Sequence, residues 1–291
     1  MKGRCVRVVG VWALVAALAG CRGTNADAEH GGASAARTPS GVEVEVLPAG
    51  AGPGSIAGAG AEQNGGTTAP KPEASPDTGL REVFPGVRAD LRAHVVEFDA
   101  RVSPMMVGDD KAPVIFLEVI CCTPNTREHE SLLVTNAKPS LIHAALLAAG
   151  FKPGSPGGWK FENEQIVGVP PTGDGLRITF GYTGRDGHEQ QADPGAWVVN
   201  LATREPIVPK GTPARFVFAG SKIIERAGEG AVYDADGSGQ VIGLHTFGSE
   251  VIAWPKTMHH EAQVQAPEWV ADLDSMPPAG TVVKVRITGA P

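Results

Sequence analysis

Cysteine is scarce in this chain, and the cysteines present do not form a recognisable motif. The 291 residues include only four. No Cys-x-x-Cys pair, no His-Glu-x-x-His sequence and no Gly-x-Ser-x-Gly turn occurs. No spacing in the chain is therefore diagnostic of a metal site or of a catalytic nucleophile.

The chain also lacks a cluster of basic residues beyond its first few positions. Its formal net charge is -7. Nucleic-acid binding depends on a clustered basic face that neutralises phosphates. We therefore expect no nucleic-acid partner.

No apolar run is long enough to span a bilayer comfortably. The run from Val8 to Ala19 follows a basic start and fits the core of a signal peptide. The residues after it, Leu18-Ala19-Gly20-Cys21, resemble the bacterial lipobox, in which the cysteine is lipidated. We predict a lipoprotein signal peptide over residues 1–20 and a lipid on Cys21, which would tether the protein to a membrane without crossing it.

Aromatic residues are absent from residues 22–79, where Gly, Ala, Pro, Ser and Thr dominate. Such a segment buries too little apolar surface to offset the entropy of ordering it. We predict a disordered tether over residues 21–79, with a reach of roughly 40 Å. Residues 42–47 alternate apolar and acidic side chains and could form a short strand or a docking segment.

The remaining residues, 80–291, are predicted to form one α+β domain: mostly antiparallel sheet with few helices. Pro139 suits the first turn of a helix that Gly150 closes. The expected turns include one at 236–239, interpreted as a hairpin. The expected strands are 94–101, 114–122, 129–135, 176–183, 197–201, 215–219, 231–235, 240–244, 251–254 and 282–287.

A hairpin joining the strands 114–122 and 129–135 would bring chemistry-bearing side chains together. If Cys122 pairs with His129, then Glu118, Cys122 and His129 share one face of the sheet. A thiol beside an imidazole can act as a nucleophile. The same face could bind zinc if His143 or His245 supplied another ligand. The structural alternative is that Cys121 and Cys122 are small buried residues, as free cysteines often are, with His129 and Glu130 as polar strand or turn residues. Separately, His259 and His260 are expected to be exposed, with metal binding in vitro as the alternative.

Several segments resemble the YdjY-domain family over most of residues 80–255. They are Glu118, Cys122, His129-Glu130-Ser131-Leu132-Leu133, residues 138–147, Gly150, residues 216–221 and residues 241–248. The resemblance implies no assigned activity. Some members are linked with ferredoxin-like proteins, but the cysteine runs that hold iron–sulfur clusters are absent here.

These patterns favour a lipid-anchored cell-envelope protein that faces the periplasm or the cell surface. Its domain is expected to be a non-catalytic binding or structural module without a cofactor. The alternatives are an enzyme that uses Cys122 and His129, or a zinc-stabilised domain that uses the same face with Glu118. The sequence names no ligand and no protein partner.

Overall fold

Eight strands hydrogen-bond in a closed ring and form a β-barrel. The computed structural model describes residues 79–108 and 113–291, all within one compact unit (69–291) of the chain. The ring closes where β5 pairs with the end of β3, Val102 lying opposite Leu133. In order round the ring the strands are β3 (Val95–Val102), β17 (Val282–Gly289), β8 (Gly175–Thr183), β11 (Arg215–Val217), β15 (Ile252–Ala253), β14 (Gln240–Gly243), β4 (Val119–Cys122) and β5 (Ser131–Val134).

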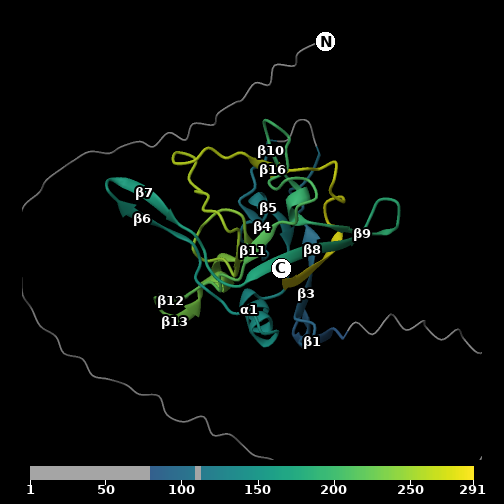
Figure 1. The fold of residues 1–291 in the computed structure, drawn as a ribbon, viewed down its shortest axis with the longest axis horizontal. Helices are drawn as coiled ribbons and strands as arrows, with labels where there is room; N and C mark the ends of the chain where they lie inside the picture. The colour runs from purple at the N-terminus through teal and green to yellow at the C-terminus, as the bar shows by residue number, and fades with distance from the viewer. Residues whose placement is uncertain (1–78, 109–112) are drawn as a thin grey trace, which may run out of the picture. The chain divides into compact units, whose positions relative to one another are not determined.

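Shorter strands extend the ring or form separate ribbons. The hairpin of β1 (Arg81–Phe84) and β2 (Val87–Asp90) continues from β3, and β9 (Glu189–Ala192) pairs with β8. Figure 1 shows the β6–β7 ribbon projecting at the left and the β10–β16 ribbon at the top. The three ribbons are β6 (Gly158–Glu162) with β7 (Gln165–Val169), β10 (Val198–Asn200) with β16 (Trp269–Ala271), and β12 (Ile223–Arg226) with β13 (Gly230–Tyr233).

The predicted helix is confirmed as α1 (Pro139–Ala148). Pro139 occupies its first turn, where a missing N–H costs nothing. Its buried face, which includes Ile142 and Leu146, packs near β1, β2 and β3. Gly150 follows the helix with φ +90°, a left-handed conformation that favours glycine. Among the described residues, no helix combines the length and apolar character needed to cross a membrane.

The predicted α+β class is wrong, because the fold is mostly β. Strands take 39% of the described residues and helices only 10%. Besides α1, the helical elements are α2 (Asp234–Ser238) and the 3₁₀ turns η1 (Glu128–Glu130) and η2 (Pro194–Ala196). Local alternation indicates strands, but closure depends on pairings between distant segments, such as β3 with β17, which single-sequence patterns do not display.

Two predicted hairpins are also wrong. Strands β4 and β5 run parallel, with Val119 opposite Ser131 and Cys122 opposite Val134. The chain returns between them through a turn and η1, although parallel neighbours usually need a longer crossover. Residues 236–239 belong to α2 and its C-terminal cap, and the strands on either side, β13 and β14, pair with other strands.

The interior of the barrel is built from alternating apolar side chains. On β17, Val285 lies opposite Phe98 of β3 on one side and Phe180 of β8 on the other. All three are fully buried. Each such side chain contributes roughly 1.5–3 kcal/mol relative to an exposed position. The predicted signal peptide, the lipid on Cys21, the strand at 42–47 and nearly all of the tether lie outside the described residues.

Candidate functional site

Both cysteines of the described residues are buried free thiols. Cys121 and Cys122 are adjacent in β4, and each is 0% exposed. Burial raises the pKa of the Cys121 thiol well above its ordinary value, and the neighbouring Cys122 adds to the effect. Burial also raises the pKa of Cys122, although hydrogen bonds from Ser131 and the Arg127 backbone oppose the shift. Both thiols are therefore protonated at neutral pH and are poor nucleophiles.

His129 does not lie opposite Cys122. The parallel register pairs Cys122 with Val134 instead, and His129 lies in η1 with a side chain that is 68% exposed. Its Nε2 atom is 3.7 Å from Oε2 of Glu130. We expected Glu118, Cys122 and His129 to share one face because we predicted an antiparallel hairpin. The strands are parallel, so the prediction of a shared face is wrong.

Glu118 instead lies beside a second carboxyl group, that of Glu130. The backbone N–H of Glu118 donates to the Glu130 carbonyl at 3.0 Å. Burial raises the pKa of Glu118 to about 7, and the charge and hydrogen bond of Glu130 add to the shift. The Arg127 guanidinium opposes it; Arg127 pairs with Glu130 and lies 3.9 Å from a Glu118 oxygen. Glu118 is therefore partly protonated near neutral pH.

His245 completes this group of titratable side chains. It is 5% exposed, and its backbone N–H donates to the Glu118 carbonyl at 2.8 Å. Burial lowers the pKa of His245 to about 4, although the charge of Glu130 opposes the shift. Its Nδ1 atom is buried with no hydrogen-bond partner among the described residues. We call Glu118, Arg127, Glu130 and His245 the Glu118 cluster; the sequence predicted Glu118 and His245 as candidates, but not Arg127 or Glu130.

Aromatic rings continue from the Glu118 cluster in a stack. The Arg127 guanidinium carbon lies 4.0 Å from the centroid of the Phe247 ring. Phe247 stacks on His260 at 4.7 Å, and His260 stacks on His259 at 5.1 Å. The ring of Trp159 lies 4.4 Å from that of His259. The prediction that His259 is exposed is wrong, since only 6% of the residue is accessible to solvent. The adjacent histidines were the sequence feature that could have indicated a ring stack here.

His143 lies in a different environment, on α1. Its Nδ1 atom is 2.8 Å from the hydroxyl of Tyr233, and its ring centroid is 4.9 Å from that of Phe218. Burial lowers the pKa of His143. Tyr233 donates its own proton to the Gly220 carbonyl at 3.0 Å. His143 thus joins α1 to the end of β13.

The four candidate zinc ligands have separate surroundings. Cys122 faces the turn after β4, His129 faces solvent, and His143 contacts Tyr233. His245 alone joins Glu118. In residues 79–108 and 113–291, no group of three or more His, Cys, Asp or Glu side chains is arranged to hold a metal ion.

A groove of about 800 Å³ lies beside the point of ring closure. Apolar residues form much of its lining, and we call it the outer groove. Its charged residues are engaged elsewhere: Arg101 donates to the Gly280 carbonyl, and Glu128 accepts from Thr126. Its lining residues are Pro85, Gly86, Asp99, Ala100, Arg101, Val102, Pro104, Pro124, Glu128, Val134, Asn136, Ala137, Gly280 and Val282.

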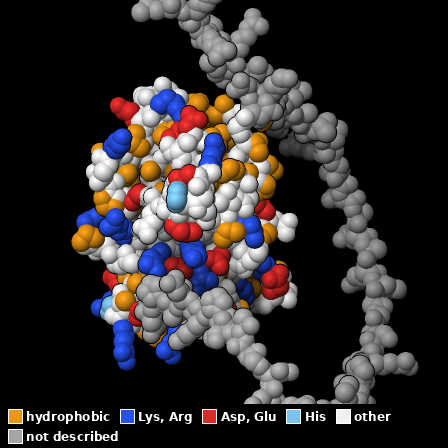
Figure 2. All heavy atoms as spheres, turned by 90° about the vertical axis from the view of Figure 1, so that its right-hand side faces the viewer, with side chains coloured by type: hydrophobic (Ala, Val, Ile, Leu, Met, Phe, Trp, Pro, Cys, Tyr) orange, Lys and Arg blue, Asp and Glu red, His pale blue; other side chains and the backbone are white. Residues whose placement is uncertain are grey.

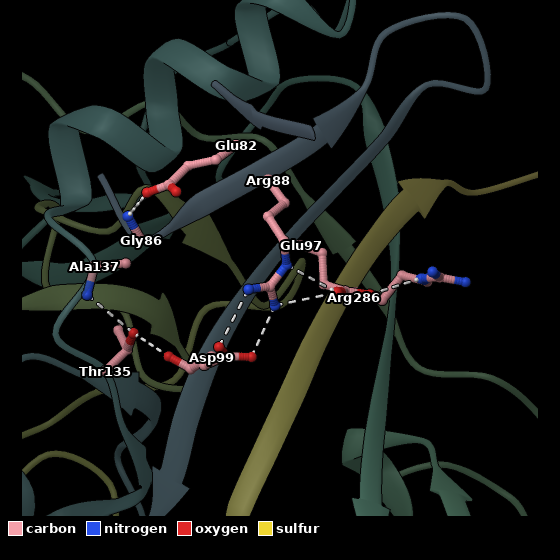
Figure 3. A network of polar contacts seen from close by, with 8 residues as sticks. All are labelled: Glu82, Gly86, Arg88, Glu97, Asp99, Thr135, Ala137 and Arg286. Atoms are coloured by element: carbon pink, nitrogen blue, oxygen red, sulfur yellow. Dashed lines mark hydrogen bonds and ion pairs between the residues drawn. The ribbon is translucent and has the colours of Figure 1, made fainter. Parts of the chain in front are cut away.

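An ion-pair network runs along the strands next to the outer groove (Figure 3). Arg88 donates to both oxygens of Asp99, the shorter contact being 2.8 Å. The buried carboxylate of Glu97 lies between Arg88 and Arg286, with Nε of Arg286 at 3.1 Å. The hydrogen bond from Arg88 lowers the pKa of Asp99. The charges here satisfy one another, so this side of the groove offers few free polar contacts.

Comparison with protein-family models matches residues 87–288 to the YdjY domain. The chain belongs to the YdjY family. The match begins at the first residue of β2 and ends within β17, so the YdjY domain includes the whole ring apart from its last residue. No curated protein and no solved structure matches the chain significantly.

The surface of the YdjY domain mixes side chains of both charges. On the face drawn in Figure 2, basic and acidic side chains are interspersed with apolar ones. Such a face carries no extended field of one sign.

Proposed function

We propose that this protein is a lipid-anchored component of the cell envelope whose YdjY domain binds a ligand or partner without catalysing a reaction. The proposed anchor is Cys21, supported by the basic start, the short apolar run and the Leu-x-x-Cys ending that precede the mature chain. The observation that carries the non-catalytic part of this proposal is the burial of Cys121 and Cys122, whose pKa values are raised.

A cysteine-dependent enzyme would need a thiolate beside a base. Cys122 is surrounded by hydroxyl groups of Ser131 and Thr126 and by the Arg127 backbone, none of which is a base. His129, the base proposed from the sequence, pairs with Glu130. These contacts favour a packing role for both thiols over the enzyme alternative.

Thiol labelling of the full chain carrying Cys5→Ser and Cys21→Ser, so that Cys121 and Cys122 are its two remaining thiols, tests the choice between binding module and enzyme. With 5,5′-dithiobis(2-nitrobenzoate), we expect the thiols of Cys121 and Cys122 to react only as the domain unfolds. Their reaction rate in the folded chain should be at least about a hundredfold lower than in the chain unfolded by urea. A Cys122→Ala variant identifies which thiol reacts. Rapid labelling of folded Cys122, with an apparent pKa below that of a free thiol, would favour the enzyme instead. Stoichiometric zinc retained through purification would favour the zinc-stabilised alternative.

Mass spectrometry of the protein isolated from its native membrane tests the anchor. We expect a mature chain that begins at Cys21 and carries acyl groups, released by detergent but not by high salt. The Cys21→Ser variant should lose the lipid and leave the membrane fraction. Retention of Met1, or an unmodified thiol at position 21, would contradict the proposed location.

A further inference from the structure

A second concavity, on the outer side of β8, has a different chemistry from the outer groove. Its volume is about 390 Å³, and we call it the β8 pocket. Three cationic side chains line it, together with two aspartates and an apolar wall. Its lining residues are Arg177, Asp193, Gly195, Ala196, Val199, Arg204, Pro206, Val208, Pro209, Lys210, Gly211, Thr212, Pro213, Asp272 and Ser275.

The acceptor groups of the β8 pocket are already occupied by the protein itself. The carboxylate of Asp193 accepts from the backbone N–H groups of Gly195 at 2.8 Å and Ala214 at 2.9 Å, one on each oxygen. The carboxylate of Asp272 accepts from Arg204 at 2.8 Å and from the Ser275 hydroxyl at 2.6 Å. Both aspartates therefore serve mainly to hold the walls of the pocket.

Two of the three cationic groups of the β8 pocket, those of Arg177 and Lys210, have no such partner in the part of the chain that the structure describes. Within the residues that the structure describes, the side chains of Arg177 and Lys210 form no ion pair and no hydrogen bond, although Arg177 lies close enough to Asp193 to oppose the burial-driven rise in the pKa of that carboxyl. Arg177 also lies directly opposite Arg215 on β11. The Arg215 guanidinium already has a partner, because it donates to the Pro291 carbonyl oxygen at 2.6 Å. Cationic groups without a partner, beside carboxylates that already accept hydrogen bonds from the protein, favour a ligand that supplies acceptors.

The rest of the β8 pocket is apolar. Val199 and Val208 line it together with Pro206, Pro209 and Pro213. An inorganic anion would leave these side chains without a partner, whereas an apolar group beside the anion would cover them. We propose that the β8 pocket binds an organic anion: a carboxylate or phosphate held by Arg177 and Lys210, with an adjoining apolar group against the valine and proline side chains.

This inference rests on the proposed binding function and gives the chemical class of one ligand. It applies to the β8 pocket alone, because Asp99, Arg101 and Glu128 of the outer groove each already have a partner in the protein. Failure at this pocket would leave the thiol and lipid measurements unchanged. The two proposals can therefore fail separately.

Titration calorimetry of the full chain with three probes of the same apolar part tests the inference. Benzoate and phenyl phosphate carry the anion, and benzamide is the neutral counterpart of benzoate. We expect one or both anions to bind, and benzamide to bind at least about tenfold more weakly, because it lacks the charge that the cations complement. Raising the salt concentration should weaken binding of the anions and leave benzamide unaffected.

Two pairs of variants assign the binding to this pocket. Arg177→Gln and Lys210→Gln should each weaken anion binding by roughly tenfold. The matched changes Arg92→Gln and Lys152→Gln remove exposed cations that do not line the pocket and should leave affinity unchanged. An unchanged thermal midpoint in all four variants establishes that they fold. Equal affinity for benzoate and benzamide, undetectable binding of both anions, or the same affinity in Arg177→Gln as in Arg92→Gln would overturn the proposal.

Discussion

The backbone N–H of His245 donates to the backbone carbonyl of Glu118 at 2.8 Å. Folding shifts the pKa values of these two side chains in opposite directions from their ordinary values. Burial raises the pKa of Glu118 to about 7 and lowers the pKa of His245 to about 4. On acidification, folded Glu118 takes up its proton earlier than the unfolded chain does, and folded His245 takes up its proton later. Between about pH 4.5 and pH 6.5, the two contributions to the pH dependence of stability should nearly cancel.

The substitution Glu118→Gln should remove the contribution of Glu118 to the pH dependence of stability and leave that of His245. Glu118 has a raised pKa, so the folded chain holds more protons than the unfolded chain from about pH 4.5 to pH 7, and this contribution to stability is lost as pH rises through that range. Glutamine cannot ionise. We expect the variant to match the parent near pH 4.5 and to exceed its free energy of unfolding at pH 8 by up to about 3 kcal/mol, measured by urea denaturation.

The control for this prediction is Glu225→Gln, which changes an exposed carboxylate on β12. It should shift stability little, and by the same amount at both pH values. A Glu118→Gln effect that is equally independent of pH would mean that folding does not raise the pKa of Glu118.

The substitution His245→Asn should remove the contribution of His245 to the pH dependence of stability and leave that of Glu118. The lowered pKa of His245 makes the unfolded chain bind more protons between about pH 6.5 and pH 4, so stability is lost as pH falls through that range. Asparagine removes this loss. Whatever the variant costs at pH 7, we expect that cost to shrink by roughly 2–3 kcal/mol at pH 4.5. The exposed His188→Asn serves as control, and a cost independent of pH in His245→Asn would contradict the prediction.

The hydroxyl of Tyr233 joins β13 to α1 and should matter for stability. It donates to the Gly220 carbonyl at 3.0 Å and lies 2.8 Å from Nδ1 of His143. Tyr233→Phe leaves both partners half-satisfied and should lower the free energy of unfolding by about 1–3 kcal/mol. Tyr182→Phe removes a hydroxyl that forms no hydrogen bond within the described residues, so it should cost much less. Equal costs would show that the contacts of Tyr233 contribute nothing net.

Gly173 should not tolerate a side chain. Its φ is +134°, and a Cβ atom there would lie 2.0 Å from the backbone oxygen of Phe218. Gly173→Ala should therefore cost about 3 kcal/mol or more, because backbone must move to relieve the contact. Gly187 also has a positive φ, +80°, but open space around its Cβ position. We expect Gly187→Ala to cost about 1 kcal/mol, and similar thermal midpoints for the two variants would refute the steric explanation.

Local patterns were enough to predict the helix and most of the long strands. Pro139 and Gly150 mark the ends of α1, because their backbone preferences act within one turn of the chain. Alternation of apolar residues marks β8 and β17, because burial on one face of a strand repeats every second residue. Neither pattern specifies which strands become neighbours, so the predicted class missed the closed ring.

The candidate site depended on those neighbours. The sequence by itself determined that Glu118 and His245 are candidate site residues and that the cysteines have no motif spacing. It also determined the resemblance of the chain to the YdjY-domain family. Only the tertiary structure decided that β4 and β5 run parallel, which separates Cys122 from His129 and places Glu118 beside Glu130. It also decided that β14 pairs with β4, which brings His245 to Glu118. The physical reason is that a pKa or a contact depends on burial and on partners distant in the chain, and these exist only once the ring has closed.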